Sequence, residues 1–418
     1  MAYKAINMPA GTAPSLSVVR IEDFLGCDLT NQPTNVDAKR SPDARNMIRD
    51  VPGKVRKRMG YKTIYTLDGR INGHHRLNGK PPLIHAGTKL YKVEDGQCDA
   101  VYESANDARS QSWEFDGKLV IADGKALLLY DGETVTRADA NGKVPILTIS
   151  RQPNGGGTSY EGLNLIQPKW EEDFLVDADH KDATEFQLSF GELDDTPVTV
   201  QVMNADGGWD DKEENTDFTV DRETGLVTFL EAPGETPVSG TDNIKIVASR
   251  TVEGYADRIN TCCVGIQFGV NGASDRLFLA GNPNLINYDW YSGMNDPTYW
   301  SDTSYSVLGQ SDAAIVGYSV VNARLAAHKN GQDAERNCIV REGNLVDNQP
   351  AFPIVNILQG EGAVGRYTFG YLQTEPLFLT ALGVYAITAQ DITGEKYSQL
   401  RSFYLNGQLL KEADLQEA

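Results

Sequence analysis

The residue types that most often carry catalysis are few and scattered in this sequence. Neither HExxH nor another metal-ligand spacing connects the five histidines, and there is no GxSxG, no GxxxxGK[ST] and no GxGxxG opening a helix. His74 and His75 follow a turn and are expected to be exposed. Because no nucleophile or acid–base pair can be assigned, we predict that the protein is not an enzyme and has no catalytic residues.

Carboxylates are abundant, with 58 Asp and Glu, so pairs of them carry little information. We interpret the pairs Asp194-Asp195, Asp210-Asp211 and Glu213-Glu214 as solvated turns. Calcium binding is the alternative, since hard cations prefer clustered oxygens, but the spacing of an EF-hand is not met. We predict no metal site and no cofactor.

The five cysteines show no repeated spacing, so neither a disulfide framework nor a Cys-x-x-Cys metal site is indicated. We expect all five to be reduced packing residues. Cys262 and Cys263 would point to opposite faces of a strand, which would leave one of them exposed.

The net charge of −20 is unevenly distributed. Residues 170–249 hold 21 Asp or Glu against four Lys or Arg, a local balance of −17, whereas residues 39–62 hold nine Lys or Arg against two Asp. The cations could neutralise phosphates or an acidic protein surface. No aromatic residue interleaves them before Tyr61, so we favour a protein partner over nucleic acid. The candidate partner-binding residues are Arg45, Arg49, Lys54, Arg56, Lys57 and Arg58.

The alternative for the basic segment of residues 39–62 is an exposed loop with a few salt bridges.

A second cluster lies in residues 287–302, NYDWYSGMNDPTYWSD, where aromatic side chains could stack on a sugar or form the centre of an interface. They can equally be bulky packing between neighbouring sheets. The candidates are Trp290, Tyr291, Tyr299 and Trp300.

The elements that must position these residues are short β-strands. Between residues 61 and 150, apolar runs alternate with Asp-Gly dipeptides, which are a strong hairpin signal. Segments such as RLFLAG, ARLAAHK and PLFLTALGVYAIT recur at roughly 40 to 50 residues, the period of propeller blades. We therefore predict an all-β fold with a β-propeller-like body. Either residues 17–26 supply a strand that completes the last blade, or the chain is a fragment of a longer product. Residues 41–50 could begin a short helix.

The run NGGGTSYEG interrupts this pattern, and four alternating strands follow it. We predict that they form a small acidic β-sandwich inserted into the body. The expected domains are an N-terminal strand and basic arm at 1–60, the first part of the propeller at 61–155, the sandwich at 160–255 and the remainder of the propeller at 256–418. No export signal and no membrane-spanning run is visible, so we expect synthesis in the cytoplasm without membrane contact.

The opening block resembles the N-terminal region of β-propeller proteins in tailed-bacteriophage virions, such as tail hub and nozzle proteins. The matching residues are Arg45-Asn46-Met47, Gly53, Arg56, Arg58 and Gly60-Tyr61. RLFLAGNPN with YSGMNDPTYWSD, and PLFLTALGVYAIT, resemble blade motifs of the same group. The likeness covers about half the chain in patches, and the acidic insertion departs from the pattern.

The resemblance implies a structural virion protein, made in the host bacterial cytoplasm, that assembles as a homo-oligomeric ring in the tail or head–tail connector. Its implied partners are other phage structural proteins, namely portal, adaptor or tail proteins, and DNA passing through the ring. Rings use heterologous contacts, so the basic arm of one subunit could reach an acidic surface of the next. The alternative is a carbohydrate- or receptor-binding tail propeller that uses Trp290, Tyr299 and Trp300, and a hydrolase is disfavoured.

Overall fold

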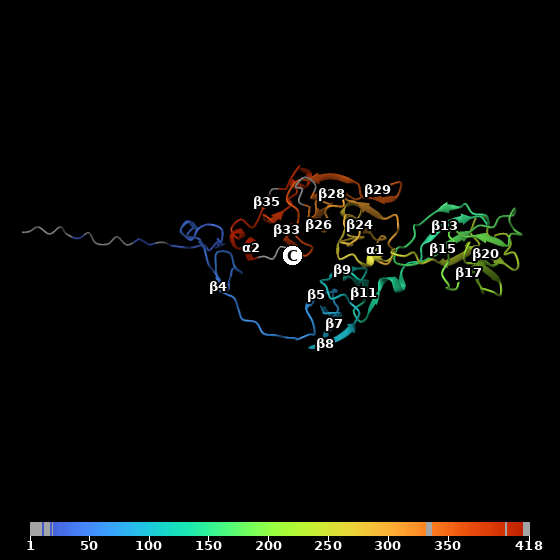
Figure 1. Cartoon of the computed structure of the whole chain (residues 1–418), viewed down its shortest axis with the longest axis horizontal. Helices are drawn as coiled ribbons and strands as arrows, with labels where there is room; N and C mark the ends of the chain where they lie inside the picture. The colour runs from blue at the N-terminus through green and yellow to red at the C-terminus, as the bar shows by residue number, and fades with distance from the viewer. Residues whose placement is uncertain (1–10, 12–16, 19, 332–336, 398, 413–418) are drawn as a thin grey trace, which may run out of the picture. The chain divides into compact units, whose positions relative to one another are not determined.

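The computed structural model describes residues 11, 17–18, 20–331, 337–397 and 399–412. Most of the N-terminal segment considered above for an export signal, and the last six residues of the chain, lie outside the described residues. The chain divides into two units (Figure 1). The terminal unit combines the chain up to Thr63 with a segment that begins at Ser402, and the main unit holds Ile64–Arg401.

The main unit contains five four-stranded antiparallel sheets that follow one another along the chain. Their strands are β5 (Ile71–His75), β6 (Leu83–Ala86), β7 (Lys89–Glu94) and β8 (Gln97–Tyr102) in the first sheet; β9 (Gln111–Phe115), β10 (Lys118–Ala122), β11 (Leu127–Tyr130) and β12 (Val135–Arg137) in the second; β22 (Val264–Gln267), β23 (Leu277–Ala280), β24 (Tyr288–Tyr291) and β25 (Tyr305–Val307) in the third; β26 (Ile315–Val321), β27 (Arg324–Lys329), β28 (Cys338–Glu342) and β31 (Ile354–Leu358) in the fourth; and β32 (Phe369–Leu372), β33 (Glu375–Thr380), β34 (Gly383–Ala386) and β35 (Gln399–Leu400) in the fifth. A hairpin of β29 (Asn344–Val346) and β30 (Gln349–Ala351) projects from the fourth sheet.

The first strand of each sheet lies against the first strand of the next, from β5 to β9, β22, β26 and β32. This is the arrangement of propeller blades, and it confirms the predicted all-β, propeller-like body. These pairings do not themselves close the five sheets into a ring. Residues 17–26 do not complete the last sheet, as the sequence had suggested, because β35 is its fourth strand.

Asp-Gly dipeptides make tight turns where two paired strands meet directly. Asp95-Gly96 joins β7 to β8 and Asp116-Gly117 joins β9 to β10, and all four residues have positive φ, between 47° and 79°. Asp and Gly are among the residues that tolerate this backbone, which matches the twist of a hairpin. At Asp131, by contrast, the carboxylate accepts hydrogen bonds from the amides of the next turn.

The acidic insertion is a β-sandwich, as predicted (Figure 1, green). A six-stranded and a three-stranded sheet enclose a core in which Phe174, Phe186 and Phe218 are fully buried. The first strand of the sandwich, β13, begins at Ile146, before residue 160, which the sequence predicted as the start of this domain. The strands are β14 (Thr158–Ser159), β13 (Ile146–Arg151), β15 (Lys169–Phe174), β21 (Ile244–Ser249), β17 (Thr199–Met203) and β18 (Trp209–Lys212) in one sheet, and β16 (Glu185–Gln187), β20 (Leu226–Phe229) and β19 (Phe218–Asp221) in the other.

The terminal unit has little regular structure. β1 (Gly26–Cys27) pairs with β2 (Arg40–Ser41) in parallel, and β3 (Met47–Ile48) pairs with β4 (Arg56–Lys57) in an antiparallel ribbon. The helix expected within residues 41–50 does not form, because Asn46 turns the chain with a φ of 60°. The C-terminal helix α2 (Asn406–Glu412) belongs to this unit rather than to the propeller. The remaining short helices are η1 (Pro33–Asn35), η2 (Ala138–Asn141), α1 (Asp257–Asn260), η3 (Val270–Gly272) and η4 (Asp391–Thr393).

All five cysteines are free thiols. The expectation that Cys262 or Cys263 is exposed is wrong, since their exposed fractions are 1% and 5%. Both residues lie between α1 and the start of β22, so the alternation of a strand does not apply to them.

His328 on β27 supplies a testable pH dependence. Its ring is buried against Phe369 and Phe378, and burial lowers its pKa to about 3. In the unfolded chain the same histidine binds a proton below pH about 6.5, so its contribution to stability falls as the pH drops from 6.5 towards 3. Between pH 6 and 4, the free energy of unfolding in urea should fall by about 1.4 kcal/mol per pH unit more steeply for the wild type than for His328→Gln.

The exposed His74 gives the matched control, because folding leaves this residue in water. His74→Gln should keep the wild-type slope. Parallel pH profiles for the wild type and His328→Gln would contradict the prediction.

Candidate functional site

The described residues contain no group of three or more His, Cys, Asp or Glu that could hold a metal ion. Within the same part of the chain, no helix combines the length and the apolar character needed to cross a bilayer. The search for a site therefore turns to side-chain networks, to the two residue clusters that the sequence singled out and to the cavities.

The nearest approach to a nucleophile beside a base is Ser110. Its Oγ lies 2.8 Å from Nε2 of His75 and 2.7 Å from Nδ1 of His85. All three residues are buried, so His75 is not exposed as the sequence suggested. The register of β5 shifts between Ile71 and Gly73, and its buried positions are Asn72 and His75. Burial lowers the pKa of His75 to about 3 and also lowers the pKa of His85. We interpret the cluster as neutral packing between sheets rather than as catalytic machinery.

The six predicted partner-binding cations are all exposed and gather around the β3–β4 ribbon. Lys57 pairs across the ribbon with Met47, and Arg56 with Ile48. Arg45 and Arg49 flank the first strand, and Lys54 and Arg58 flank the second. The ribbon therefore brings together residues that span 14 positions of the sequence.

These cations differ in how far they are already bound within the unit. Nε of Arg56 lies 2.6 Å from Oδ2 of Asp50, and this hydrogen bond lowers the pKa of the Asp50 carboxyl. Nε of Arg58 donates to Oδ1 of Asn46 at 2.9 Å. Lys54 and Lys57 have no ion pair among the described residues.

The same unit exposes an unusual share of large apolar side chains. Met59 and Tyr61 are 79% and 88% exposed, and no apolar residue among the unit's described residues is buried. Only Asp28 and Ser402 are buried there, and Asp28 is held by hydrogen bonds from Thr30 and Asn31. We call the following set the apolar face: Val18, Ile21, Leu25, Met47, Val51, Val55, Met59, Tyr61, Phe403, Tyr404 and Leu405.

The two ends of the chain hold each other within this unit. The amide of Leu29 donates to the carbonyl of Tyr404 at 2.7 Å, and the amide of Gly407 donates to Oγ1 of Thr30 at 3.1 Å. The guanidinium of Arg40 stacks 3.6 Å from the centre of the Tyr404 ring. No local pattern in the sequence indicated this pairing of distant segments.

The aromatic cluster of residues 287–302 separates into two kinds of residue. Trp290 and Trp300 are 2% and 0% exposed and belong to one hydrophobic core cluster, so they offer no ring face to a sugar. This corrects their assignment as glycan-binding candidates. Tyr291 and Tyr299 are only half-buried.

The loop that carries Tyr299 and Trp300 anchors the root of the sandwich. The amide of Trp300 donates to Oδ1 of Asn164 at 3.1 Å, and the amide of Leu165 donates to the carbonyl of Trp300 at 2.8 Å. The hydroxyl of Tyr299 donates to the carbonyl of Gly162 at 3.0 Å. Asn164, which the sequence analysis missed, also donates through Nδ2 to the carbonyls of Lys143 and Thr298.

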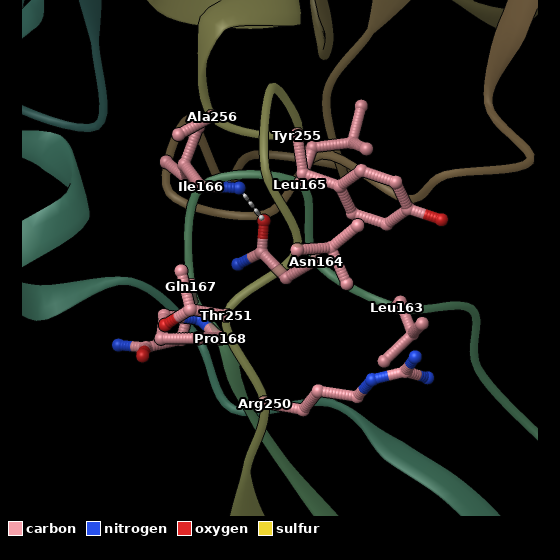
Figure 2. A pocket seen from close by; sticks show the side chains of 11 residues that line it. Leu163, Asn164, Leu165, Ile166, Gln167, Pro168, Arg250, Thr251, Tyr255 and Ala256 are labelled. Atoms are coloured by element: carbon pink, nitrogen blue, oxygen red, sulfur yellow. Dashed lines mark hydrogen bonds between the residues drawn. The ribbon is translucent and has the colours of Figure 1, made fainter. Parts of the chain in front are cut away.

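A small cavity lies beside this anchor, between the segments that enter and leave the sandwich. Figure 2 shows its lining, with Oδ1 of Asn164 accepting a hydrogen bond from the amide of Ile166. The cavity volume is about 80 Å³, enough for a few water molecules. We therefore interpret it as a packing gap and not as a ligand site.

Comparisons with known proteins leave the function open. No protein-family model and no curated protein matches the chain. Among solved structures, it is similar to a proposed 6-phosphogluconolactonase from Bacteroides fragilis, with 10% identity, 75% of this chain and 78% of that chain covered and a TM-score of 0.29. It is also similar to a proposed TolB from Agrobacterium tumefaciens, with 11% identity, 75% of this chain and 88% of that chain covered and a TM-score of 0.20.

The extracellular domain of a proposed hybrid two-component system from B. thetaiotaomicron is 9% identical, with 81% of this chain covered and a TM-score of 0.24. The chain spans only 41% of the length of that protein. None of these TM-scores reaches 0.5, so the fold is defined by the sheets described above, and no function follows from the similarity.

Asn164 gives a direct test of the anchor. It is 3% exposed and its side chain bonds four backbone groups. Asn164→Ala leaves those groups without partners and should lower the free energy of unfolding by about 3 kcal/mol, measured in urea. Asn344→Ala, at an exposed strand position, should change it by less than about 0.5 kcal/mol. Equal effects of the two substitutions would show that the anchor does not hold the sandwich.

Proposed function

We propose that this protein is a structural component of a tailed-bacteriophage virion, which assembles as a ring in the tail or the head–tail connector and has no catalytic role. The observation that carries the proposal is the terminal unit, in whose described part many large apolar side chains are exposed and none is fully buried. Burial of apolar surface is the main driving force for folding and association. A unit of this kind gains that burial from a partner, as expected of a building block.

Charge favours the sandwich of a neighbouring copy as that partner. Three cations of the sandwich are already used within it, since Arg151 pairs with Glu172, Arg222 with Glu214 and Lys245 with Glu171. Apart from Glu172 and Asp173, which are buried, the acidic residues of 170–249 are exposed or half-buried. A contact of the basic ribbon with the sandwich of the next subunit is heterologous, and repeated heterologous contacts generate rings.

The assignment to a phage virion is supported by the motif resemblance around Arg45-Asn46-Met47 and Gly60-Tyr61. Portal, adaptor or tail proteins are the other partners that this role implies, and DNA would pass through the ring. The protein would be made in the host cytoplasm and reside in the virion. A carbohydrate- or receptor-binding tail propeller is the second candidate, and Tyr291 and Tyr299 are the aromatics that remain available for it.

The electrostatic part of the proposed contact between the basic ribbon and the neighbouring sandwich can be tested by charge reversal. Arg56→Glu, Lys57→Glu and Arg58→Glu together should abolish the oligomers that the wild type forms at low salt, measured by sedimentation velocity. In the wild type, 0.5 M NaCl should weaken the same oligomers, because salt screens exposed charges.

The matched control reverses three exposed lysines of the first two sheets, Lys80, Lys118 and Lys125. It changes the net charge equally and should leave assembly intact. Unchanged oligomers in the ribbon variant, or equal loss in both triple variants, would refute the proposed contact.

The apolar half gives an independent prediction. Val55 and Met59 are 40% and 79% exposed, and the burial of their remaining surface against a partner is worth about 2–3 kcal/mol for the two together. Val55→Ser with Met59→Ser should therefore weaken association at least about tenfold, while the urea unfolding of the main unit stays the same. Val307→Ser, at a position of the main unit that is 46% exposed, should not affect association. Association that is insensitive to the double substitution would remove the apolar face from the interface.

A further inference from the structure

A second cavity also borders the sandwich anchor, because Gly162 and Tyr299 line it. Three segments that are distant in sequence form it. They are Tyr160 at the root of the sandwich, Tyr291 of β24 with Arg276 and Tyr299 from the adjoining loops, and Gln349 in the β29–β30 hairpin. Its volume is about 340 Å³, about four times that of the cavity beside Asn164. This volume is in the range of small-molecule sites.

Two of the three aromatic rings of this cavity are held in place by contacts within the protein. The ring of Tyr291 packs edge-on against Phe352, with centroids 4.8 Å apart. The ring of Tyr299 is held by its hydroxyl, which donates to the carbonyl of Gly162, and by Nζ of Lys143, 4.7 Å from its centroid. Tyr160 is 60% exposed and its side chain has no hydrogen bond among the described residues. The cavity thus has two rigid rings and one free ring.

A buried cation adds hydrogen-bond donors to these rings. Arg276 is 7% exposed, and one of its guanidinium nitrogens, Nη1, donates to Oδ1 of Asp275 at 2.9 Å. Its other guanidinium N–H groups have no partner among the described residues, although the side chain lines the cavity. Nε and Nη2 of Arg276 are not among the buried side-chain atoms that lack a hydrogen-bond partner, so they are open to the cavity, where a ligand oxygen can accept from them in place of water.

The charges at the cavity are balanced internally. Arg276 is paired with Asp275, and Glu161 is paired with Lys143. The second oxygen of Glu161 accepts a hydrogen bond from the amide of Ile146. Since no charge is left uncompensated, the site suits a ligand that carries many hydroxyl groups and no net charge.

We propose that this cavity binds a neutral saccharide unit, with its C–H faces against Tyr160 and Tyr291 and its hydroxyls on Arg276 and Gln349. Tyrosine rings offer an apolar face with a polar tip, which suits a ligand that is apolar on its faces and polar at its rim. The inference does not depend on ring assembly, because the cavity lies in the main unit and the residues substituted in the assembly tests lie in the terminal unit.

The test is saturation-transfer NMR on the full chain with the methyl glycosides of glucose, galactose, mannose and N-acetylglucosamine, and with glucuronate and galacturonate. At least one neutral glycoside should give a signal that Tyr160→Ala lowers at least tenfold. Gln349→Ala, at an exposed position, should weaken the same signal. Near-ultraviolet circular dichroism confirms that each variant is folded.

Tyr305→Ala is the matched control. Tyr305 is 46% exposed, belongs to the same sheet as Tyr291 and lines a different cavity. It should leave the signal intact. The proposal is overturned if none of the four glycosides binds, if only the uronates bind, or if the signal survives Tyr160→Ala. Loss of ring assembly in the ribbon variant would not change any of these results.

Discussion

A folded segment must bury apolar surface, and no apolar residue is fully buried among the described residues of the terminal unit. Its apolar face is exposed, and its order comes from short strands, from turns and from hydrogen bonds between the two ends of the chain. Such bonds contribute about 1 kcal/mol each in water, so they do not replace a core. The proposed assembly role follows from this constraint, because a neighbour that covers the face supplies the missing burial.

The main unit, in contrast to the terminal unit, has buried hydrophobic cores. Its sheets are joined by buried contacts, of which the ion pair between Arg341 and Asp289 is the clearest, since both side chains are fully buried. Tyr318 also donates to Asp289 at 3.1 Å, so the fourth sheet holds a carboxylate of the third from two sides. Burial raises the pKa of Asp289, and Arg341 opposes that rise. The sandwich is fastened to this scaffold through Asn164 and Trp300.

Local features of the sequence predicted the fold well. Asp95-Gly96 and Asp116-Gly117 encode their turns by backbone preference alone, and the alternation around Phe218 encodes a strand of the sandwich. Residues whose role depends on distant neighbours were not predictable. Trp300 and Tyr299 are adjacent and aromatic, yet only the fold makes one a core residue and the other a wall of a cavity. The pairing of Leu29 with Tyr404 joins segments 375 residues apart, and no short pattern records it.

The dependence of the terminal unit on a partner is tested most directly by amide hydrogen exchange, followed by mass spectrometry over a concentration series of the wild-type chain. Peptides from residues 20–63 and 402–412 should exchange rapidly at the lowest concentration and become protected as oligomers form, while the strands of the main unit stay protected throughout. Protection of these two segments at the lowest concentration, equal to that of the main-unit strands, would contradict the claim.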